Sequence, residues 1–218
     1  MKILITGGTG FIGSAFLKLA LSRGHEVAAL IRPGKAPLQL DPNAAGVTWL
    51  RGTIRDAPWD PIDAFQPEAC LHAAWITTPD LYLESPENQD YLTWSRQFLR
   101  RILVSGTRRL VALGTCIEYQ PEPRPLREQE SLINPTTLYA RCKNALRLDI
   151  EATAAQTGSS CCWGRVFYPY GPGEHPARLC SSGIRQIRAG QPVMLRTPAS
   201  VKDYVYIADL AEALLMVI

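Results

Sequence analysis

The sequence predicts an α/β protein in which helices cover both faces of a doubly wound, mostly parallel sheet. Short apolar runs alternate with longer amphipathic stretches along the chain, which is the pattern of repeated βαβ units. Several runs are apolar at consecutive positions, as strands must be when both of their faces are covered. The first run leads directly into a glycine-rich turn and a helical pattern, which is how Rossmann-like folds begin.

Six short apolar runs are the predicted strands, in chain order Lys2–Thr6, Glu26–Ile31, Val47–Arg51, Ala69–Ala73, Arg109–Leu113 and Cys161–Phe167. Three amphipathic stretches are the predicted helices, Phe11–Arg23, Gln89–Ser105 and Thr136–Gln156. Gly24, Gly106 and Gly158 follow these stretches closely, and glycine is the residue that most often closes a helix.

Two later segments interrupt the alternation. Four prolines over residues 120–135 predict a surface excursion before the third helix. From Tyr168 onward glycine and proline become frequent, so we expect one domain over residues 1–167 and a second region over 168–218, interleaved with it. The apolar helical pattern that ends at Ile218 has no capping glycine, which predicts an incomplete second region and the N-terminal portion of a longer architecture.

The composition excludes several classes of protein. Of the 218 residues, 46% are hydrophobic and 20% charged, so neither a disordered nor a fibrous protein fits. The apolar runs are far shorter than the ~20 residues of a membrane span, and the N-terminus lacks a signal-peptide core. We therefore expect a cytoplasmic protein without membrane contact. The basic residues behind the net charge of +3 are scattered, which argues against a nucleic-acid partner. Six cysteines without a C-x-x-C pair predict reduced thiols and no metal site.

The glycine-rich turn after the first strand is the first candidate binding site. Gly7, Gly10 and Gly13 recur at three-residue intervals, and Phe11 and Ile12 open the helix that follows. A phosphate cradle needs a tight turn, a backbone without side chains near the pyrophosphate, and a helix N-terminus directed at negative charge. The turn therefore predicts a dinucleotide-binding site.

The end of the second strand should select the dinucleotide, because an acid there binds the ribose hydroxyls whereas an arginine pairs with a 2′-phosphate. Arg32 occupies this position, and Lys35 is near enough in the chain to add a second positive charge. Glu26 lies at the opposite end of the same strand. We therefore expect NADP(H) as the cofactor, with NAD(H) as the alternative.

The helix after the proline-rich segment carries a candidate acid–base pair. Tyr139 and Lys143 are four residues apart and share one helical face, where the ammonium is expected to lower the phenol's pKa from about 10. Thr115, at the end of the fifth strand, adds a hydroxyl that could hold a substrate oxygen beside Tyr139. These three are the predicted catalytic residues.

With the glycine turn, Thr115 and the Tyr139–Lys143 pair in this order, the chain resembles the extended branch of the short-chain dehydrogenase/reductase superfamily. The stretches LHAAW, ALGTCIEYQ, GRVFYPYGPGE and KDYVYIADLAEAL support the likeness. The last two are similar to those of nucleotide-sugar epimerases, dehydratases and ketoreductases. The resemblance implies a nucleoside-diphosphate sugar as substrate, hydride transfer with the bound cofactor, and a homodimer as one assembly.

The resemblance also implies roles for residues outside the catalytic set. Lys143 would hold the nicotinamide ribose. His72, at the end of the fourth strand, lies beside the expected cofactor, although a packing histidine is the other interpretation. Tyr168 stands where the family has an asparagine at the sugar site, and Arg178 and Lys202 are candidate partners for the substrate's diphosphate.

Two departures from the family pattern bear on the reaction. The 4,6-dehydratases have an Asp-Glu pair after the catalytic hydroxyl, where this chain has Cys116 and Ile117. Ile117 also stands where GDP-fucose synthase-like enzymes have a cysteine. We therefore expect an NADPH-dependent reduction of a nucleotide-linked keto-deoxysugar, with Tyr139 as the acid. The alternatives are a nucleotide-sugar C4 epimerase or dehydratase with bound NAD, and a non-catalytic NADP-binding sensor.

Overall fold

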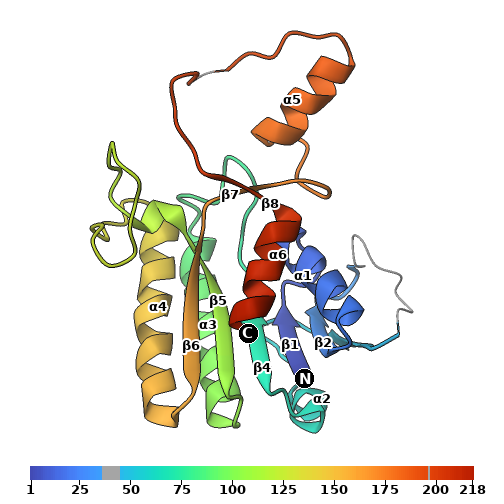
Figure 1. Ribbon diagram of the computed structural model, residues 1–218. Helices are drawn as coiled ribbons and strands as arrows, with labels where there is room; N and C mark the ends of the chain where they lie inside the picture. The colour runs from blue at the N-terminus through green and yellow to red at the C-terminus, as the bar shows by residue number, and fades with distance from the viewer. Residues whose placement is uncertain (36–44, 196) are drawn as a thin grey trace.

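Six parallel strands form one sheet in the computed structural model, which describes residues 1–35, 45–195 and 197–218 (Figure 1). In chain order they are β1 (Lys2–Thr6), β2 (Glu26–Ile31), β3 (Val47–Arg51), β4 (Ala69–His72), β5 (Arg109–Thr115) and β6 (Ser160–Val166). Their spatial order is β3-β2-β1-β4-β5-β6, so the direction of winding reverses between β1 and β4. In sheets of this kind, ligands bind at the carboxyl ends of the strands near the point of reversal.

Helices cover both faces of the sheet. They are α1 (Phe11–Ser22), α2 (Trp59–Phe65), α3 (Glu87–Val104), α4 (Leu138–Thr157) and α6 (Ile207–Val217). Helices α1 and α6 lie side by side over one core, which includes Ile3 and Ile5 of β1. Helices α2, α3 and α4 cover the other core, which includes Leu4. Successive residues of β1 therefore enter different cores, which explains why the strand is apolar at consecutive positions.

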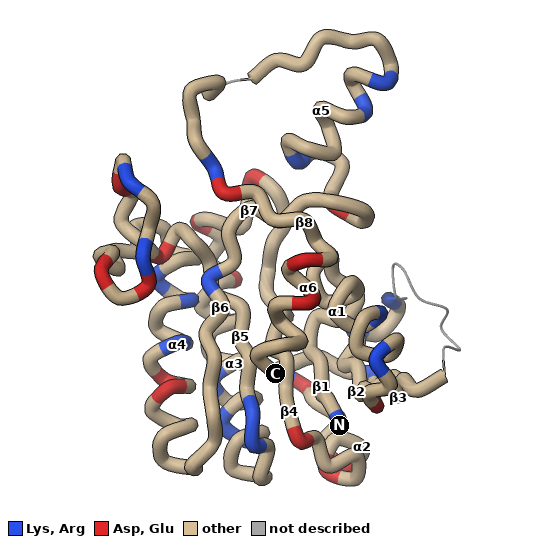
Figure 2. The backbone as a smooth tube through the Cα atoms, viewed as in Figure 1, with Lys and Arg blue, Asp and Glu red and all other residues tan. Residues whose placement is uncertain are grey.

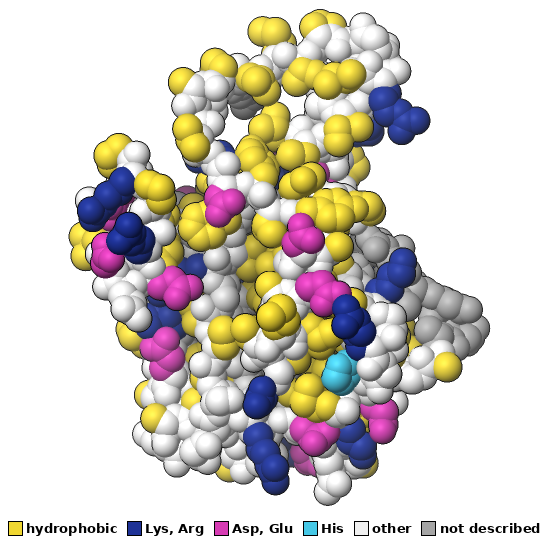
Figure 3. All heavy atoms as spheres, viewed as in Figure 1, with side chains coloured by type: hydrophobic (Ala, Val, Ile, Leu, Met, Phe, Trp, Pro, Cys, Tyr) yellow, Lys and Arg dark blue, Asp and Glu magenta, His cyan; other side chains and the backbone are white. Residues whose placement is uncertain are grey.

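After β6 the chain leaves the sheet and forms a small lobe above the carboxyl ends of the strands (Figure 1). In this lobe, β7 (Tyr168–Tyr170) pairs in parallel with β8 (Tyr204–Tyr206), and α5 (Leu179–Arg188) lies between them in the sequence. Helix α5 has no buried residue, and Figure 3 shows hydrophobic side chains on the surface of the lobe. The chain then returns to the sheet as α6, so its last helix belongs to the main layers.

The predicted elements agree closely with the structure. Strands β1, β2 and β3 have the predicted bounds, β4 ends one residue earlier at His72, β5 continues to Thr115, and β6 is shifted by one residue. The three predicted helices are present with ends within two residues of expectation. Gly24, Gly106 and Gly158 all have positive φ, the conformation in which glycine closes a helix. Helix α2 was not predicted, because seven residues are too few to show a helical period.

The charged side chains are spread over the fold in Figure 2 without a continuous basic stripe. Among the described residues, none of the helices combines the length and the apolar content that a membrane span needs. All six cysteines are free; Cys70 and Cys142 are buried, and the other four are half-buried.

Candidate active site

The turn between β1 and α1 requires glycine at its key positions. Gly7 has a φ of +74°, and a Cβ there would lie 2.7 Å from the carbonyl carbon of Ala73. A Cβ on Gly13 would lie 2.2 Å from the carbonyl oxygen of Gly7. Helix α1 starts at Phe11, directly after Gly10, which has no side chain to cap it. A tight bare turn that leads into an uncapped helix N-terminus fits the pyrophosphate of a dinucleotide.

Arg32 follows β2 directly and is exposed. Because β2 pairs with β1 in parallel, Arg32 lies at the same edge of the sheet as the glycine turn. The amide of Lys35 donates a hydrogen bond to the carbonyl oxygen of Arg32 over 3.1 Å, and this turn keeps both cations at that edge. Residues 27–35 contain no acid, so the charges here fit a 2′-phosphate.

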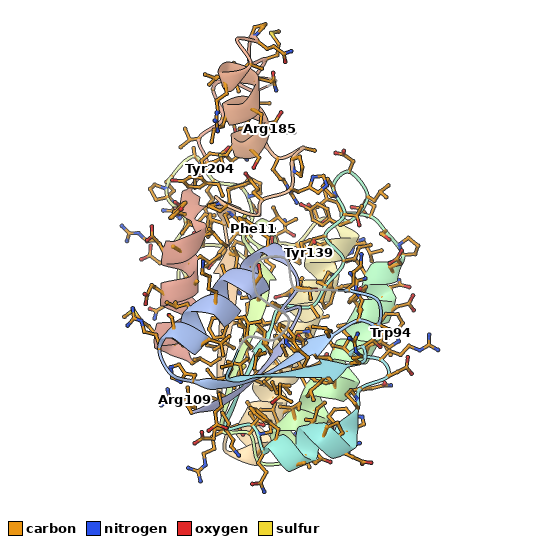
Figure 4. All side chains as sticks on the ribbon, turned by 90° about the vertical axis from the view of Figure 1, so that its right-hand side faces the viewer. Phe11, Trp94, Arg109, Tyr139, Arg185 and Tyr204 are labelled. Atoms are coloured by element: carbon orange, nitrogen blue, oxygen red, sulfur yellow. The ribbon has the colours of Figure 1, made fainter. Side chains whose placement is uncertain are left out.

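Thr115, Tyr139 and Lys143 come together at the carboxyl edge of the sheet. Thr115 ends β5 and Tyr139 lies in the first turn of α4; both are less than 10% exposed, and the Thr115 side chain lies near enough to the phenol of Tyr139 to lower its pKa. Lys143 is one helical turn further on and almost fully buried. Figure 4 shows Tyr139 and Phe11 at a similar height, below the lobe that holds Arg185 and above Arg109.

The expectation that Lys143 lowers the pKa of Tyr139 is wrong for this structure. Burial has the largest effect on Tyr139 and raises its pKa, and Tyr82 and Glu118 act in the same direction. The Thr115 side chain lowers the pKa of Tyr139 and so opposes this rise only in part. Tyr139 is therefore held in its protonated form, the form of a proton donor.

The ammonium of Lys143 lies closer to Leu113 and Trp75 than to the ring of Tyr139. Its Nζ donates a hydrogen bond of 2.8 Å to the carbonyl oxygen of Leu113 and lies 4.0 Å from the ring centroid of Trp75, compared with 5.9 Å for the ring of Tyr139. Burial lowers the pKa of Lys143 to about 7, although the charge of Glu118 acts against this fall. Lys143 therefore changes charge near neutral pH.

His72 does not fit the cofactor contact expected for it. It is fully buried, and its Nδ1 lies 2.9 Å from the Thr6 hydroxyl while its Nε2 lies 3.0 Å from the Ser95 hydroxyl. Burial lowers its pKa to about 3, and the charge of Lys143 acts in the same direction. With both ring nitrogens occupied inside the protein, the packing interpretation is the one that fits.

Two of the predicted substrate residues approach the catalytic edge from the lobe. Tyr168 starts β7 and lies near enough to Cys116, which directly follows Thr115, to lower the pKa of that thiol. Nζ of Lys202 lies 5.0 Å from the ring centroid of Tyr168. This pair therefore lies beside the residue that follows Thr115.

The third predicted substrate residue contacts a segment that the sequence did not single out. The guanidinium of Arg178 lies 5.7 Å from the ring centroid of Tyr82. Tyr82 packs edge-on against Tyr139, with ring centroids 5.0 Å apart. Tyr82 lies in the turns between β4 and α3, where no period marks it, so only the folded chain reveals it.

Sequence reasoning also missed Glu118, which is fully buried and accepts hydrogen bonds from the Thr115 amide and from Arg165. A signal was present. Glu118 lies between the apolar Ile117 and Tyr119, and Arg165 interrupts an otherwise uncharged predicted strand. Two such isolated opposite charges in apolar surroundings are expected to pair.

Comparison with known proteins gives a consistent result. The model of the NAD dependent epimerase/dehydratase family matches residues 3–218. A UDP-glucose 4-epimerase of Streptomyces lividans is 28% identical, and the match covers 100% of this chain and 71% of that protein. A dTDP-6-deoxy-L-talose 4-dehydrogenase (NAD(+)) of Aggregatibacter actinomycetemcomitans is also 28% identical, with 77% of this chain and 61% of that protein covered.

Solved structures agree with this result. The crystal structure of the Thermus thermophilus UDP-glucose 4-epimerase in complex with NAD superposes with a TM-score of 0.82 at 27% identity, covering 99% of this chain and 74% of that one. The chain thus spans between 61% and 74% of the length of these three proteins. Because the family model runs from the first strand to the last helix, through both the glycine turn and the catalytic helix, the chain belongs to the NAD-dependent epimerase/dehydratase family, a group of NAD(P)-dependent enzymes within the extended short-chain dehydrogenase/reductase superfamily.

Proposed function

We propose that the chain reduces a nucleotide-linked keto-deoxysugar with NADPH, and that Tyr139 is the proton donor. The observation that carries this proposal is a buried, protonated phenol that lies beside Thr115 and one helical turn from Lys143 at the carboxyl edge of the sheet. A carbonyl reduction needs a protonated group that can give its proton to the carbonyl oxygen, and the phenol of Tyr139 is protonated at neutral pH. The likeness to a dTDP-6-deoxy-L-talose 4-dehydrogenase supports a nucleotide-linked deoxysugar as the substrate class.

Each residue of the site has its own role in the proposed reaction. Thr115 holds the carbonyl oxygen, and Tyr139 gives its phenolic proton to that oxygen as the carbonyl becomes an alcohol. Lys143, whose Nζ lies 5.9 Å from the ring centroid of Tyr139, would hold the nicotinamide ribose of the cofactor. The glycine turn and the first amides of α1 hold the pyrophosphate of the cofactor. NADPH, when bound, supplies the hydride.

The residues after Thr115 favour reduction over loss of water. Dehydration needs an additional acid–base pair beside the sugar, and the two positions that follow Thr115 hold Cys116 and Ile117. Burial raises the pKa of the Cys116 thiol, so this side chain stays neutral at physiological pH. A neutral thiol beside an isoleucine supplies no carboxylate for removing water.

The lobe of residues 168–206 would form part of the sugar site in this proposal. Its Tyr168 and Lys202 adjoin Cys116, and its Arg178 adjoins Tyr82. Cations on a segment that covers the catalytic edge suit the diphosphate of a nucleotide sugar. In this proposal residues 168–206 face the sugar, while α6 packs on the sheet.

The direct test uses purified protein, NADPH and a dTDP-linked 4-keto-6-deoxyhexose. The expected result is a fall in the absorbance of the reduced nicotinamide that depends on the sugar, with formation of the 4-hydroxy product. The same assay with UDP-linked and GDP-linked 4-keto sugars identifies the nucleotide. Absence of oxidation with every member of this panel would refute the proposed function.

The preference for NADPH has its own test in Arg32→Ala. Removing a charged partner of the 2′-phosphate should raise the Kd for NADPH roughly tenfold or more, since hydrogen bonds to charged groups contribute about 1.5–3 kcal/mol. The Kd for NADH should not change, because NADH lacks this phosphate. Both constants are measured by titrating the fluorescence of the reduced nicotinamide. An equal effect on the two constants would contradict a 2′-phosphate site at Arg32.

A C4 epimerase with permanently bound NAD is the second candidate, and the likeness to two UDP-glucose 4-epimerases favours it. Analysis of the cofactor that is released on denaturing the purified protein separates the two functions. A reductase should lose its cofactor during purification and bind added NADPH reversibly. Stoichiometric NAD in the extract, together with interconversion of UDP-glucose and UDP-galactose, would favour the epimerase.

A further inference from the structure

Glu118 is the most fully enclosed charged side chain next to the catalytic residues. It belongs to the short 3-10 helix Cys116–Glu118 that follows β5, and it has no exposed surface. Burying a carboxylate is costly unless donors surround it. Glu118 has three such donors, and all of them hydrogen bond to its two oxygens within 3.1 Å.

One of these donors is the backbone of the catalytic threonine. The Thr115 amide donates to Oε1 of Glu118 over 2.8 Å, and in return the Thr115 side chain accepts from the Glu118 amide. This reciprocal arrangement is a capping box. A hydroxyl that accepts a hydrogen bond from an amide keeps its own proton free to donate. The box therefore fixes both the place of the Thr115 side chain and the direction in which its hydroxyl can act.

The other two donors come from β6, the neighbouring strand. The indole Nε1 of Trp163 lies 3.1 and 3.0 Å from the two oxygens of Glu118, and Nε of Arg165 lies 2.9 Å from Oε2. Arg165 also donates a hydrogen bond of 3.1 Å to the hydroxyl of Tyr119. Glu118 thus links the end of β5 to β6 by charge-assisted hydrogen bonds, which are the stronger kind.

The surrounding backbone is shaped to admit this carboxylate. A Cβ on Gly114, the residue before Thr115, would lie 2.2 Å from Nε1 of Trp163 and 2.6 Å from Oε1 of Glu118. No other residue type fits at that position without displacing the carboxylate or the indole. The hydrogen bonds of Glu118 therefore require glycine at position 114, near the end of β5.

The charge of Glu118 also reaches the two titrating catalytic groups. It raises the pKa of Lys143, against the effect of burial, and it raises the pKa of Tyr139. Both effects have the sign expected of a fixed negative charge, since it favours the ammonium and disfavours the phenolate. The groups that face Glu118 itself are Arg165, Trp163 and the Thr115 amide, so no second acid shares its site among the contacts described.

From these contacts we propose that Glu118 is a positioning residue of the reaction, which holds the Thr115 hydroxyl against Tyr139 by a charged capping box anchored on β6. The inference rests on the proposed reductase function for its kinetic consequences, but not for the geometry. Glu118 touches neither Tyr139 nor the glycine turn by any described hydrogen bond, so it acts through Thr115 and through its charge.

The test variant is Glu118→Gln, which keeps the size of the side chain. All three partners of Glu118 are donors, so the amide nitrogen of a glutamine must face one of them without an acceptor. We expect kcat to fall roughly 10- to 100-fold, the loss that corresponds to one charged hydrogen bond. The Kd for NADPH should stay unchanged, because the glycine turn is not part of this network. The matched control is Glu130→Gln, which removes an exposed carboxylate paired with Arg127 in the neighbouring loop and should change neither value.

A double-mutant cycle separates positioning from a general structural role. In a Thr115→Ala background, Glu118→Gln should lower kcat by less than twofold, because the hydroxyl it positions is already gone. The alkaline limit of the kcat/KM profile should also move to lower pH in Glu118→Gln, since the charge that raised the pKa of both Tyr139 and Lys143 is removed. A full additional loss in the Thr115→Ala background, or an unmoved pH profile, would overturn the inference.

Amide hydrogen exchange gives a readout that needs no substrate. In Glu118→Gln the peptide that contains Thr115 should exchange roughly tenfold faster or more, whereas Glu130→Gln should leave it unchanged. If the wild-type protein oxidises no NADPH with any sugar, the proposed function fails and this exchange alone decides the role of Glu118. Unchanged exchange at Thr115 would overturn the inference even in an active enzyme.

If the Glu118→Gln variant does not fold, Trp163→Phe is the second variant, because it removes one neutral donor to Glu118. We expect its kcat to fall roughly 2- to 10-fold. An unchanged kcat in this variant would contradict the inference.

Discussion

At the scale of single residues, burial moves the pKa values of Tyr139 and Lys143 in opposite directions. Each shift disfavours the charged form, so the phenol gains and the ammonium loses affinity for its proton. The site therefore keeps its phenol protonated and holds a lysine that titrates near neutral pH. The phenol has a proton to give to a carbonyl oxygen, and its raised pKa makes it a weaker acid than an exposed tyrosine.

Tyr139→Phe removes the phenolic proton and leaves the ring in place. We expect kcat to fall roughly 100- to 10,000-fold, the usual contribution of a positioned general acid, while the Kd for NADPH stays the same. Steady-state kinetics and cofactor titration measure the two quantities. An unchanged kcat would exclude Tyr139 as the acid, and an intact biological response without turnover would favour the non-catalytic sensor.

Lys143 makes stability depend on pH. Its pKa is about 7 in the folded chain and about 10.4 in an unfolded one, so between these values the unfolded state holds more protons and the free energy of unfolding rises with pH. Burial of the ammonium therefore destabilises the fold fully below pH ~7, and this effect fades toward pH ~10.

Lys143→Met removes the buried ammonium, so its free energy of unfolding relative to wild type should be more favourable at pH ~6.5 than at pH ~9. Urea denaturation at the two pH values measures the difference, with the exposed lysine variant Lys18→Met as the control. A gap between Lys143→Met and wild type that does not change with pH would contradict the burial of a charged lysine.

At the scale of elements, the close packing of the glycine turn leaves no room for a side chain at Gly13. Gly13→Ala would place a methyl group 2.2 Å from the carbonyl oxygen of Gly7, so we expect a loss of stability of about 1–3 kcal/mol and loss of NADPH binding. Gly8→Ala is the matched control, because its nearest neighbours would lie at an ordinary 3.5 Å and stability should change by less than about 0.5 kcal/mol. Thermal unfolding and cofactor titration measure these effects. Equal losses in the two variants would contradict the steric account.

The same scale shows what sequence patterns can and cannot reveal. Strands such as β1 and β2 were predictable because burial on both faces imposes a run of apolar residues that a reader of the sequence can see. The Thr115, Tyr139 and Lys143 set was predictable because each lies at a fixed place relative to a strand end or a helical turn. Glu118 was missed because two of its donors lie on β6, and hydrogen bonds between distant segments leave no period; the isolated charges of Glu118 and Arg165 were the one signal for it.

The pKa of Tyr139 was mispredicted for a related reason. Spacing along α4 shows that Lys143 is on the same face, but it does not show how deeply both side chains are buried or that the ammonium turns to the carbonyl of Leu113. Desolvation depends on the whole surrounding structure. The direction of the shift therefore became clear only once the packing was known.

At the scale of the whole molecule, stability is unevenly divided between the sheet layers and the lobe. Helix α5 buries none of its residues, and Ile184 and Ile187 are more than half exposed, whereas α4 buries seven of its residues. Segments with few buried contacts open at low free energy. We expect amide protons of α5 to exchange faster than those of α3 and α4, as measured by hydrogen exchange and mass spectrometry. Similar protection in all three helices would contradict this picture.

The pairing of β7 with β8 fastens the lobe at both its beginning and its end. Tyr168 lies opposite Tyr204 and Tyr170 opposite Tyr206, so the chain enters and leaves the lobe through one two-stranded clasp. Because this one pair of strands holds both ends of the lobe, we expect the chain between them to tolerate changes in length and sequence without moving the sheet, the glycine turn or α6. Exchanging this segment between related proteins should therefore alter the proposed substrate site and leave the proposed catalytic residues in place.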